Sequence, residues 1–360
     1  MLVKQKQDLS VYKSLIIYYF SGTGNAKHAA EWIAEIAEEL DIDTQLINID
    51  HLEKIVFPKS EEKTLVGFCS PTHGFNLPPV MLKFIWKFPR RNQTDVFILN
   101  TRAGMKMSKL FLPGISGAAQ VYAALVLMTK GYRVRGMQPL DLPSNWISLH
   151  PGLKQKVVNS IFERHEKITK MFAERILSGG SKYKALLSLP IDILLFPIAI
   201  GYYIIGRFAI AKTFFADNSC TRCRLCEKQC PVNAIKMIEG RPYWTFSCES
   251  CMRCMSNCPE RAIQTSHTYS IGIWFLFASL FLPWLLRKFY SFEFIHINSN
   301  SWLARWVEDV ILWGVGLMVI FLFYRLSHYF LKFTFFNNIM AYTSFTKYRF
   351  WRRYKGVSSE

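Results

Sequence analysis

The chain has 360 residues, of which 51% are hydrophobic and 15% aromatic, and its formal net charge is +18 at pH 7. This length allows two or three compact units, and the hydrophobic content is high for a wholly soluble protein, so we expect part of the chain to meet lipid. A strong positive charge favours either nucleic acid or an anionic membrane surface as a partner. Because the sequence shows no compact motif for DNA or RNA and basic residues lie near apolar segments, we expect membrane lipid and no nucleic acid.

The first predicted unit begins with a strand, a glycine-rich loop and a helix. Residues 1–12 are polar and lack the apolar core of a secretory signal, so we expect the chain to start in the cytoplasm. Residues 14–20 (SLIIYYF) suit a buried parallel strand, and residues 26–40 have apolar side chains at helical spacing. The free amides and the dipole at such a helix start can bind a phosphate. The loop residues are Ser21, Gly22, Thr23, Gly24 and Asn25.

Neither the P-loop pattern nor the Rossmann dinucleotide pattern is present in this loop. The phosphate of a mononucleotide therefore fits better than a nucleoside triphosphate or a dinucleotide. An ordinary glycine-rich turn is the alternative.

Strands and helices continue to alternate through the first half of the chain. We expect strands near residues 44–49, 64–69, 95–100 and 132–137, and helices near 80–88, 117–130 and 151–177. This order predicts an α/β fold with a doubly wound parallel sheet, in which ligands bind beyond the carboxyl ends of the strands. Three loops should meet there, the first at a phosphate and the other two beside a planar ring. Candidates in the other two are Pro71, Thr72, His73, Gly74, Phe75, Asn100, Thr101, Arg102 and Gly104.

The motifs YFSGTGNAKHAA, PTHGFNLPP and NTRAG resemble the phosphate and ring loops of flavodoxins, which bind FMN. The resemblance implies a flavodoxin-like domain over residues 13–177 with FMN as its cofactor. Flavodoxins often carry a hydroxyl residue at the position of Ala26, so we expect one phosphate contact fewer and weaker FMN binding. His73 would either hydrogen-bond the flavin or be a structural or solvated histidine, and Phe75 would either stack on the ring or anchor its loop. Cys69 suits a small buried apolar side chain rather than a reactive thiol.

Eight of the nine cysteines lie in residues 220–259, in two runs of the form C-x-x-C-x-x-C-x-x-x-C-P that begin 28 residues apart. Runs of this form hold paired [4Fe-4S] clusters in bacterial two-cluster ferredoxins, where the fourth cysteine of each run binds the other cluster. One cluster would be held by Cys220, Cys223, Cys226 and Cys258. The second would be held by Cys248, Cys251, Cys254 and Cys230.

The spacing and context of the cysteines favour iron–sulfur clusters over two alternatives. Zinc sites usually join two cysteine pairs across a longer gap, and disulfide frameworks belong to secreted chains. An Ala-Ile pair follows the proline of both runs, which indicates that a whole unit is duplicated. We expect a small α+β ferredoxin domain over residues 212–266. With the segment LPSNWI at 142–147, these runs and the loops above resemble the flavodoxin–ferredoxin fusions called EFR-type ferredoxins, over residues 13–264.

Apolar segments flank the cysteine runs on both sides. Residues 178–211 form a linker whose stretch 185–206 has one charge and two prolines. It is long enough to span a bilayer, but a single span would separate the flavin from the clusters. We therefore expect an interfacial or re-entrant segment, or one packed on the cluster domain.

Residues 269–331 form a predicted membrane region with two helices, at 269–286 and from 310 onward. The alternative is a pair of helices that lie on the membrane. The second helix reaches spanning length only if it continues past Arg325 and His328. Residues 344–360 carry five Lys or Arg and one Glu, so positive-inside bias places the tail over residues 332–360 in the cytoplasm with the flavin and the clusters.

These features predict a membrane-anchored electron-transfer protein that passes electrons between FMN and two [4Fe-4S] clusters. Its partners would be redox donor and acceptor proteins or a quinone. Two alternatives stay open: an FMN-dependent reductase of a small molecule that the clusters supply with electrons, and an iron–sulfur redox sensor. The sequence shows no activated nucleophile with its base, and we assign no catalytic residue.

Overall fold

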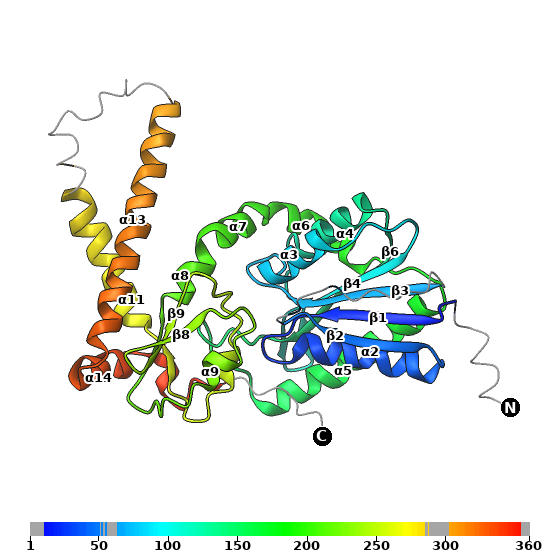
Figure 1. The fold of residues 1–360 in the computed structure, drawn as a ribbon, viewed down its shortest axis with the longest axis horizontal. Coiled ribbons are helices and arrows are strands. Elements are labelled where there is room, and N and C mark those ends of the chain that lie inside the picture. Colours follow the sequence, from blue (N-terminus) through cyan, green and yellow to red (C-terminus); the bar gives the residue numbers. More distant parts are fainter. Residues whose placement is uncertain are drawn as a thin grey trace.

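The computed structural model describes residues 11–50, 52, 55, 63–284, 287 and 302–353. The N-terminal part is built on a sheet whose parallel strands follow the order β2-β1-β3-β4-β6 (Figure 1). This is the flavodoxin-like order, so the predicted doubly wound sheet is confirmed. The parallel strands are β1 (Ser14–Tyr19), β2 (Asp43–Asn48), β3 (Thr64–Pro71), β4 (Asp95–Met107) and β6 (Arg133–Pro143).

Helices cover both faces of this sheet. The helices α2 (Asn25–Glu39) and α5 (Gln155–Leu177) pack on one face, and α3 (Pro79–Lys87) and α4 (Ala119–Thr129) pack on the other. Successive side chains of β1 alternate between the two cores, with Leu15 in the first and Ile16 in the second. Burying a side chain of this size contributes about 1.5–3 kcal/mol, which explains why β1 is apolar along its whole length.

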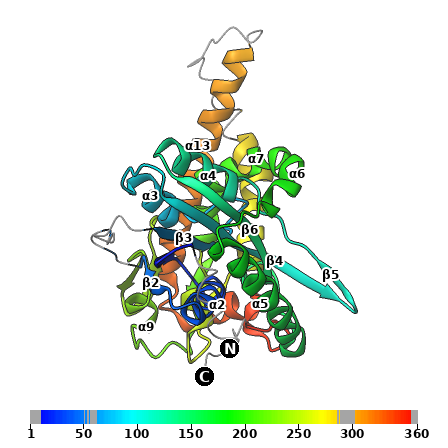
Figure 2. The ribbon, with the colours of Figure 1, turned by 90° about the vertical axis from the view of Figure 1, so that its right-hand side faces the viewer.

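One prediction about the sheet is wrong. The sequence predicts a ligand loop that contains Asn100, Thr101, Arg102 and Gly104, but β4 continues through these residues and turns back at β5 (Leu110–Leu112) as an antiparallel hairpin. Figure 2 shows this hairpin extending beyond the rest of the sheet. The extension is stabilised by pairing with β6, in a register that joins Thr101 to Leu140 and Gly104 to Pro143.

A bent series of short helices connects the sheet to the cysteine-rich part. Its elements are η2 (Lys184–Ser188), α6 (Leu189–Leu194), α7 (Phe196–Gly201), η3 (Tyr202–Gly206) and α8 (Arg207–Ala211). Pro190 and Pro197 lie in the first turns of α6 and α7, where proline is tolerated but prevents the preceding helix from continuing. The two halves, Lys184–Leu194 and Phe196–Ala211, meet at 78°.

The one acidic residue of this connector is buried against the flavodoxin-like part. A carboxylate oxygen of Asp192 accepts a hydrogen bond from the backbone amide of Gly117 at 2.8 Å, and the other accepts one from Ser188 at 2.9 Å. The bond from Gly117 fixes the start of the connector to the loop before α4, and the bond from Ser188 lies within the connector.

The cysteine-rich part is a small α+β unit with internal repetition. Strand β7 (Phe214–Ala216) pairs with β10 (Ile263–Thr265), and β8 (Ile235–Ile238) pairs with β9 (Arg241–Trp244). The short helices α9 (Leu225–Lys228) and α10 (Arg253–Ser256) follow corresponding cysteines of the two runs. Left-handed backbone conformations recur at 28-residue offsets, at Arg222 and Ser250, Arg224 and Met252, and Asn233 and Arg261.

Two helices project from the cysteine-rich part (Figure 1). The first comprises α11 (His267–Leu276) and the π-helical turn η4 (Phe277–Phe281), and the second is α13 (Trp302–Phe330). They approach each other where a β-carbon on Gly316 would lie 3.4 Å from the ring of Phe277. Within the described ranges no unbroken helix has the length and apolarity to cross a bilayer, although the bent pair 184–211 meets both criteria when its halves are taken together. Residues 285–286 and 288–301 of the predicted membrane region, and 354–360 of the predicted tail, lie outside the described residues.

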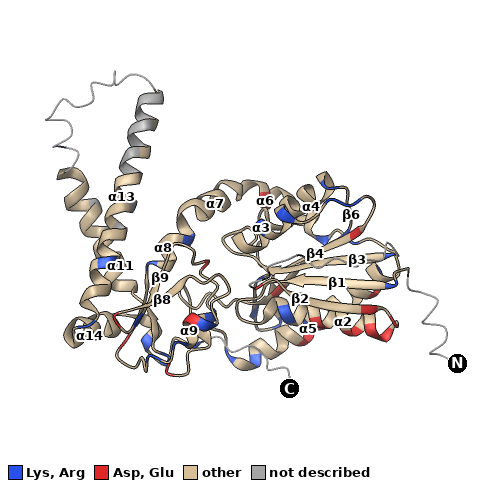
Figure 3. Cartoon of the chain, viewed as in Figure 1, with Lys and Arg blue, Asp and Glu red and all other residues tan. Residues whose placement is uncertain are grey.

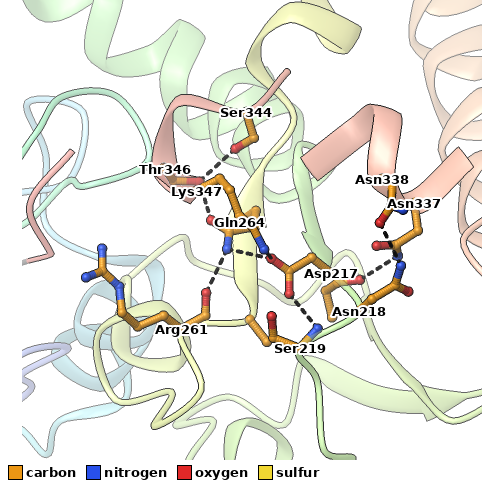
Figure 4. Close-up of polar contacts among 12 residues, drawn as sticks. Asp217, Asn218, Ser219, Arg261, Gln264, Asn337, Asn338, Ser344, Thr346 and Lys347 are labelled. Carbon is orange, nitrogen blue, oxygen red and sulfur yellow. Dashed lines mark hydrogen bonds and ion pairs between the residues drawn. The ribbon is translucent and has the colours of Figure 1, made fainter. Parts of the chain in front are cut away.

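The segment after α13 packs back on the cysteine-rich part. It contains α14 (Thr334–Tyr342) and η5 (Phe345–Lys347). Figure 4 shows how its polar side chains meet those around β7 and β10. Lys347 pairs with the buried carboxylate of Asp217 at 2.7 Å, and Thr346 donates to Gln264 at 2.8 Å. Beyond η5, the indole of Trp351 donates to the carbonyl of Ile147, so the segment also reaches the flavodoxin-like part.

Candidate functional site

The glycine-rich loop lies between β1 and α2, as predicted. Gly24 has a φ of 103°, in the left-handed region that glycine adopts without strain, and its amide donates to the Ser21 hydroxyl at 3.1 Å. The side-chain amide of Asn25 donates to the carbonyl of Pro143 at 2.9 Å, and Asn145 donates to the hydroxyl of Thr23. Pro143 ends β6 and Asn145 follows it, so the loop is tied to the carboxyl end of this edge strand. Ala26 is buried and offers no hydroxyl, as expected.

The second predicted loop is a tight turn at the end of β3. The amide of His73 donates to the carbonyl of Asn76 at 2.8 Å, and the reverse bond is 3.1 Å. Gly74 and Phe75 at its tip have positive φ, at 53° and 64°. Burial lowers the pKa of His73 to about 4, and its Nδ1 has no hydrogen-bond partner. His73 is therefore a buried, neutral histidine rather than a solvated one.

The remaining predicted residues lie within the extended β4. The side chain of Asn100 donates to the hydroxyl of Thr72, and the carbonyl of Thr101 accepts from the amide of Thr72 at 2.7 Å. Arg102 is buried and pairs with Asp141 of β6 at 2.6 Å. Pro71 is the last residue of β3. The structure thus brings residues 21–25 and 71–76 to one edge with residues 143–146, while the guanidinium of Arg102 is held by a carboxylate of the next strand.

Two aromatic residues lie over the second loop: Trp146, within the segment LPSNWI, and Tyr202, which the sequence did not single out. The indole of Trp146 stacks on His73 with ring centroids 6.2 Å apart, and Tyr202 of η3 lies 5.5 Å from Trp146. A β-carbon on Gly74 would clash with the Tyr202 ring. Tyr202 is separated from this loop by more than 120 residues, so no local signal could have identified it.

The first loop suits the phosphate of FMN. It combines hydroxyl groups with the first-turn amides of α2, which have no acceptor within the helix. Trp146 and Tyr202 fill the space beside His73 and Gly74, where the resemblance to flavodoxins implies the flavin ring.

The cysteines lie in two groups, which we compare with the two predicted sets of four cluster ligands. Cys220, Cys223, Cys226 and Cys258 line one cavity, which Cys254 also reaches. The second group is more buried: burial, and then the neighbouring thiols Cys251 and Cys230, raise the pKa of Cys248 to about 12. Burial likewise raises the pKa of Cys251 to about 12. Thiols so raised stay protonated unless a cation or cluster replaces the proton.

The surroundings of these sulfurs fit iron–sulfur clusters. The amide of Ala234 donates to the sulfur of Cys230 at 3.1 Å, and that of Ala262 donates to Cys258 at 3.4 Å. The two alanines occupy equivalent places in the repeat. The amide of Ser250 donates to Cys248 at 3.4 Å. Amide-to-sulfur hydrogen bonds stabilise negative charge on cluster ligands and help to set their potential. Cys69, outside both runs, is fully buried at the end of β3, as expected of a small apolar side chain.

The two halves of the site touch directly. A β-carbon on Gly22 would clash with the carbonyl oxygen of Cys251, so the glycine-rich loop lies against the second cysteine run. The guanidinium of Arg253 donates to the carbonyls of Ser21 at 2.6 Å and Gly22 at 3.1 Å. It also contacts the carbonyl of Gln229 at 3.1 Å, in the first run, and the carboxylate of Asp50 at 2.6 Å. Arg253 thus joins both cysteine runs to the loop.

Comparison with protein-family models gives two matches. Residues 17–109 match the flavodoxin family, and residues 219–263 match the 4Fe-4S dicluster domain. The chain joins a flavodoxin domain to a 4Fe-4S ferredoxin domain. The flavodoxin domain implies FMN and the ferredoxin domain implies 4Fe-4S clusters, so an electron-transfer role follows from both.

Solved structures resemble the flavodoxin domain at low identity. A flavodoxin from the domain Archaea is 17% identical, with a TM-score of 0.28, over 45% of this chain and 98% of that chain. A short-chain flavodoxin associated with a non-canonical PDU bacterial microcompartment is 11% identical, with a TM-score of 0.27, over 44% and 99%. Rubredoxin oxygen:oxidoreductase from the anaerobe Desulfovibrio gigas is 14% identical, with a TM-score of 0.28, over 49% and 38%. Comparison with curated proteins gave no significant match.

Proposed function

We propose that the protein is a membrane-anchored electron carrier with FMN and two [4Fe-4S] clusters in one chain. Cys220, Cys223, Cys226 and Cys258 would hold one cluster, and Cys248, Cys251, Cys254 and Cys230 the other. When bound, FMN exchanges one or two electrons, whereas a cluster passes one at a time, so the combination converts between the two kinds of transfer. The chain's own residues set the distance between the cofactors and the polarity around them.

The contact between Gly22 and Cys251 carries this proposal. The glycine-rich loop, which would bind the FMN phosphate, lies there against the loop that would hold the second cluster. In a diffusible pair of carriers such a contact would form only during an encounter. Here the Arg253 hydrogen bonds keep it closed within one chain, which supports transfer between the two domains rather than independent roles for each.

Exposed apolar side chains support membrane anchoring. In the connector, Leu187 is 83% exposed and Leu194 is 77% exposed. On the projecting helices, Phe275 and Leu322 are 65% and 61% exposed. Figure 3 shows that charged residues are absent from α7 and sparse on the described parts of α11 and α13. Large exposed apolar surfaces of this kind mark membrane or partner contacts, and the basic tail favours the cytoplasmic side. The partner would then be a quinone or a membrane redox complex.

The proposal is tested by purifying the full chain from membranes without oxygen and measuring iron, sulfide and flavin. We expect about eight irons and eight sulfides per chain, in the membrane fraction. The purified protein would then be reduced once with FMN bound and once without it. The visible spectrum of the clusters would report how far the clusters are reduced in each case. Fewer than about eight irons per chain with no flavin, or protein found wholly in the soluble fraction, would contradict the proposal. Steady turnover of a soluble acceptor that survives removal of the membrane would favour the reductase alternative instead.

A further inference from the structure

A cavity of about 180 Å³ lies at the base of the two projecting helices, where they meet the ferredoxin domain. Its floor comes from β7, through Phe214 and Phe215, and its walls come from α8, α11 and α13. The cysteines do not line it, so it is separate from the cluster sites. It is also distant in sequence and fold from the glycine-rich loop of the flavodoxin domain.

The side of this cavity toward the projecting helices is apolar. Ile273, Phe277, Val319 and Phe323 line it there. Phe323 is also 43% exposed on the outer surface of α13, so the cavity wall is continuous with the apolar surface that we propose meets lipid. A hydrophobic molecule in the bilayer would reach the cavity without crossing water.

The side toward the ferredoxin domain carries hydrogen-bonding groups. The hydroxyls of Tyr269 and Ser327 are 2.5 Å apart, and the Tyr324 hydroxyl lies 3.3 Å from the carbonyl of Phe214. Lys212 is 7% exposed and donates to the carbonyl of Trp244. Its ammonium also lies 4.6 to 5.8 Å from four aromatic ring centroids. An ammonium has three donors, so Lys212 can also donate to an oxygen in the cavity.

The cavity adjoins the core that contains the second group of cysteines. Phe214, which lines the cavity, packs edge-on against Trp244 with ring centroids 5.8 Å apart. Trp244 belongs to the same buried cluster as Cys230 and Cys248. A ligand in the cavity would therefore lie beside the ferredoxin core, on the side away from the flavodoxin domain.

We infer that this cavity binds the ring of a lipid-soluble quinone. A cavity of roughly 150 Å³ with apolar walls takes up benzene, so 180 Å³ holds one substituted ring but not an isoprenoid chain. One carbonyl oxygen would accept a hydrogen bond from Lys212. The other would accept one from the Tyr269 hydroxyl in place of its bond to Ser327, which itself donates to the carbonyl of Phe323 at 2.6 Å. The chain would leave between α11 and α13. An acyl chain has no oxygen to accept from Lys212, whose ammonium has further donors beyond its bond to the Trp244 carbonyl, and burying such a charge against hydrocarbon is costly. The role of a bound quinone as an electron carrier rests on the proposed function, whereas the binding test does not.

The test is equilibrium dialysis of the full chain in detergent against radiolabelled decyl-benzoquinone, with decanol as the control for chain binding. We expect saturable quinone binding that excess decanol does not displace. Lys212→Met removes the ammonium at nearly constant length and should weaken binding about tenfold, as the loss of one charged hydrogen bond does. Lys332→Met is the matched control, because Lys332 is an exposed lysine after α13 that packs on Tyr329 rather than on the cavity.

A second variant guards against a folding defect. Val319→Phe fills the apolar wall without changing charge and should also weaken quinone binding, with helical content measured by circular dichroism unchanged. The inference is overturned if decanol competes equally, or if Lys212→Met and Lys332→Met bind alike. Because dialysis needs no electron flow, a chain that binds quinone but carries no iron would refute the proposed function and leave this inference supported.

Discussion

Replacing Arg253 should open the junction between the two domains. Its guanidinium bonds the carbonyls of Ser21, Gly22 and Gln229 and pairs with Asp50. The side chains of Arg253 and Asp50 are 17% and 9% exposed, so the pair is largely shielded from water. Removing one partner of such a pair costs about 3 kcal/mol, since it leaves the other charge poorly solvated. Arg253→Ala should therefore increase the population of the open junction by about 150-fold.

Hydrogen exchange of backbone amides, followed by mass spectrometry on the full chain, measures this opening. We expect faster exchange in peptides that cover residues 21–25 and 250–253, with unchanged exchange in β1 and β3. Arg253→Lys keeps a positive charge opposite Asp50 but loses the planar fork, so its effect should be intermediate.

Arg224→Ala is the matched control for this prediction. Arg224 lies in the first cysteine run, its side chain is 61% exposed, and it pairs with Glu227 three residues away. Exposed pairs of this kind contribute little. If Arg253→Ala and Arg224→Ala give the same exchange at residues 21–25, Arg253 does not hold the junction closed.

Three further outcomes are expected. Cys258→Ser should lower the iron content from about eight to about four per chain, because Cys258 lies in the cavity of the first run; Cys69→Ala should keep full iron, and equal losses would refute the assignment. Burial lowers the pKa of His73 to about 4, below an unfolded value of about 6.5. The stability that neutral His73 contributes is therefore complete above pH 6.5 and is lost as the pH falls toward 4. The wild-type chain should lose about 2 kcal/mol of unfolding free energy between pH 7 and pH 5 for this reason, and His73→Gln should not lose it. Denaturant titrations at the two pH values measure the difference. Tyr202→Ala should tighten FMN binding about tenfold in fluorescence titrations, since the tyrosine ring over Gly74 no longer has to move. Tyr203→Ala is the control and should leave the affinity unchanged. An unchanged affinity in Tyr202→Ala would show that Tyr202 is no obstacle to FMN.

Local pattern was enough to predict the sheet and the cysteine groups. The alternation of Leu15 and Ile16 between two cores, and the repeated cysteine spacing, are short-range features that need no knowledge of distant residues. The length of β4 was missed because its apolar run ends at Leu99 and is followed by the mixed sequence NTRAGMKM. Arg102 is acceptable inside a strand only because Asp141 lies beside it on β6, and no local signal links them.

The junction was also beyond prediction, for a similar reason. Arg253, Trp146 and Tyr202 are each far in sequence from the loops that they contact. The sequence indicated that two redox domains share a chain, but the contact between them depends on how the connector bends at Leu195. Pro197 ends the preceding helix, but the local sequence does not determine the direction in which the next helix leaves.

The return of residues 345–353 to the ferredoxin domain has a consequence for the order of assembly. Arg353 donates to the carbonyls of Met255 and Ile263, close to the cysteines of the second run. The Arg352 guanidinium donates to the carbonyl of Gly152, whose amide donates to the carbonyl of Arg352. Ribosomes synthesise these residues after the cysteine runs and both projecting helices. The contacts of Arg352 and Arg353 can therefore form only after the whole ferredoxin domain has been made.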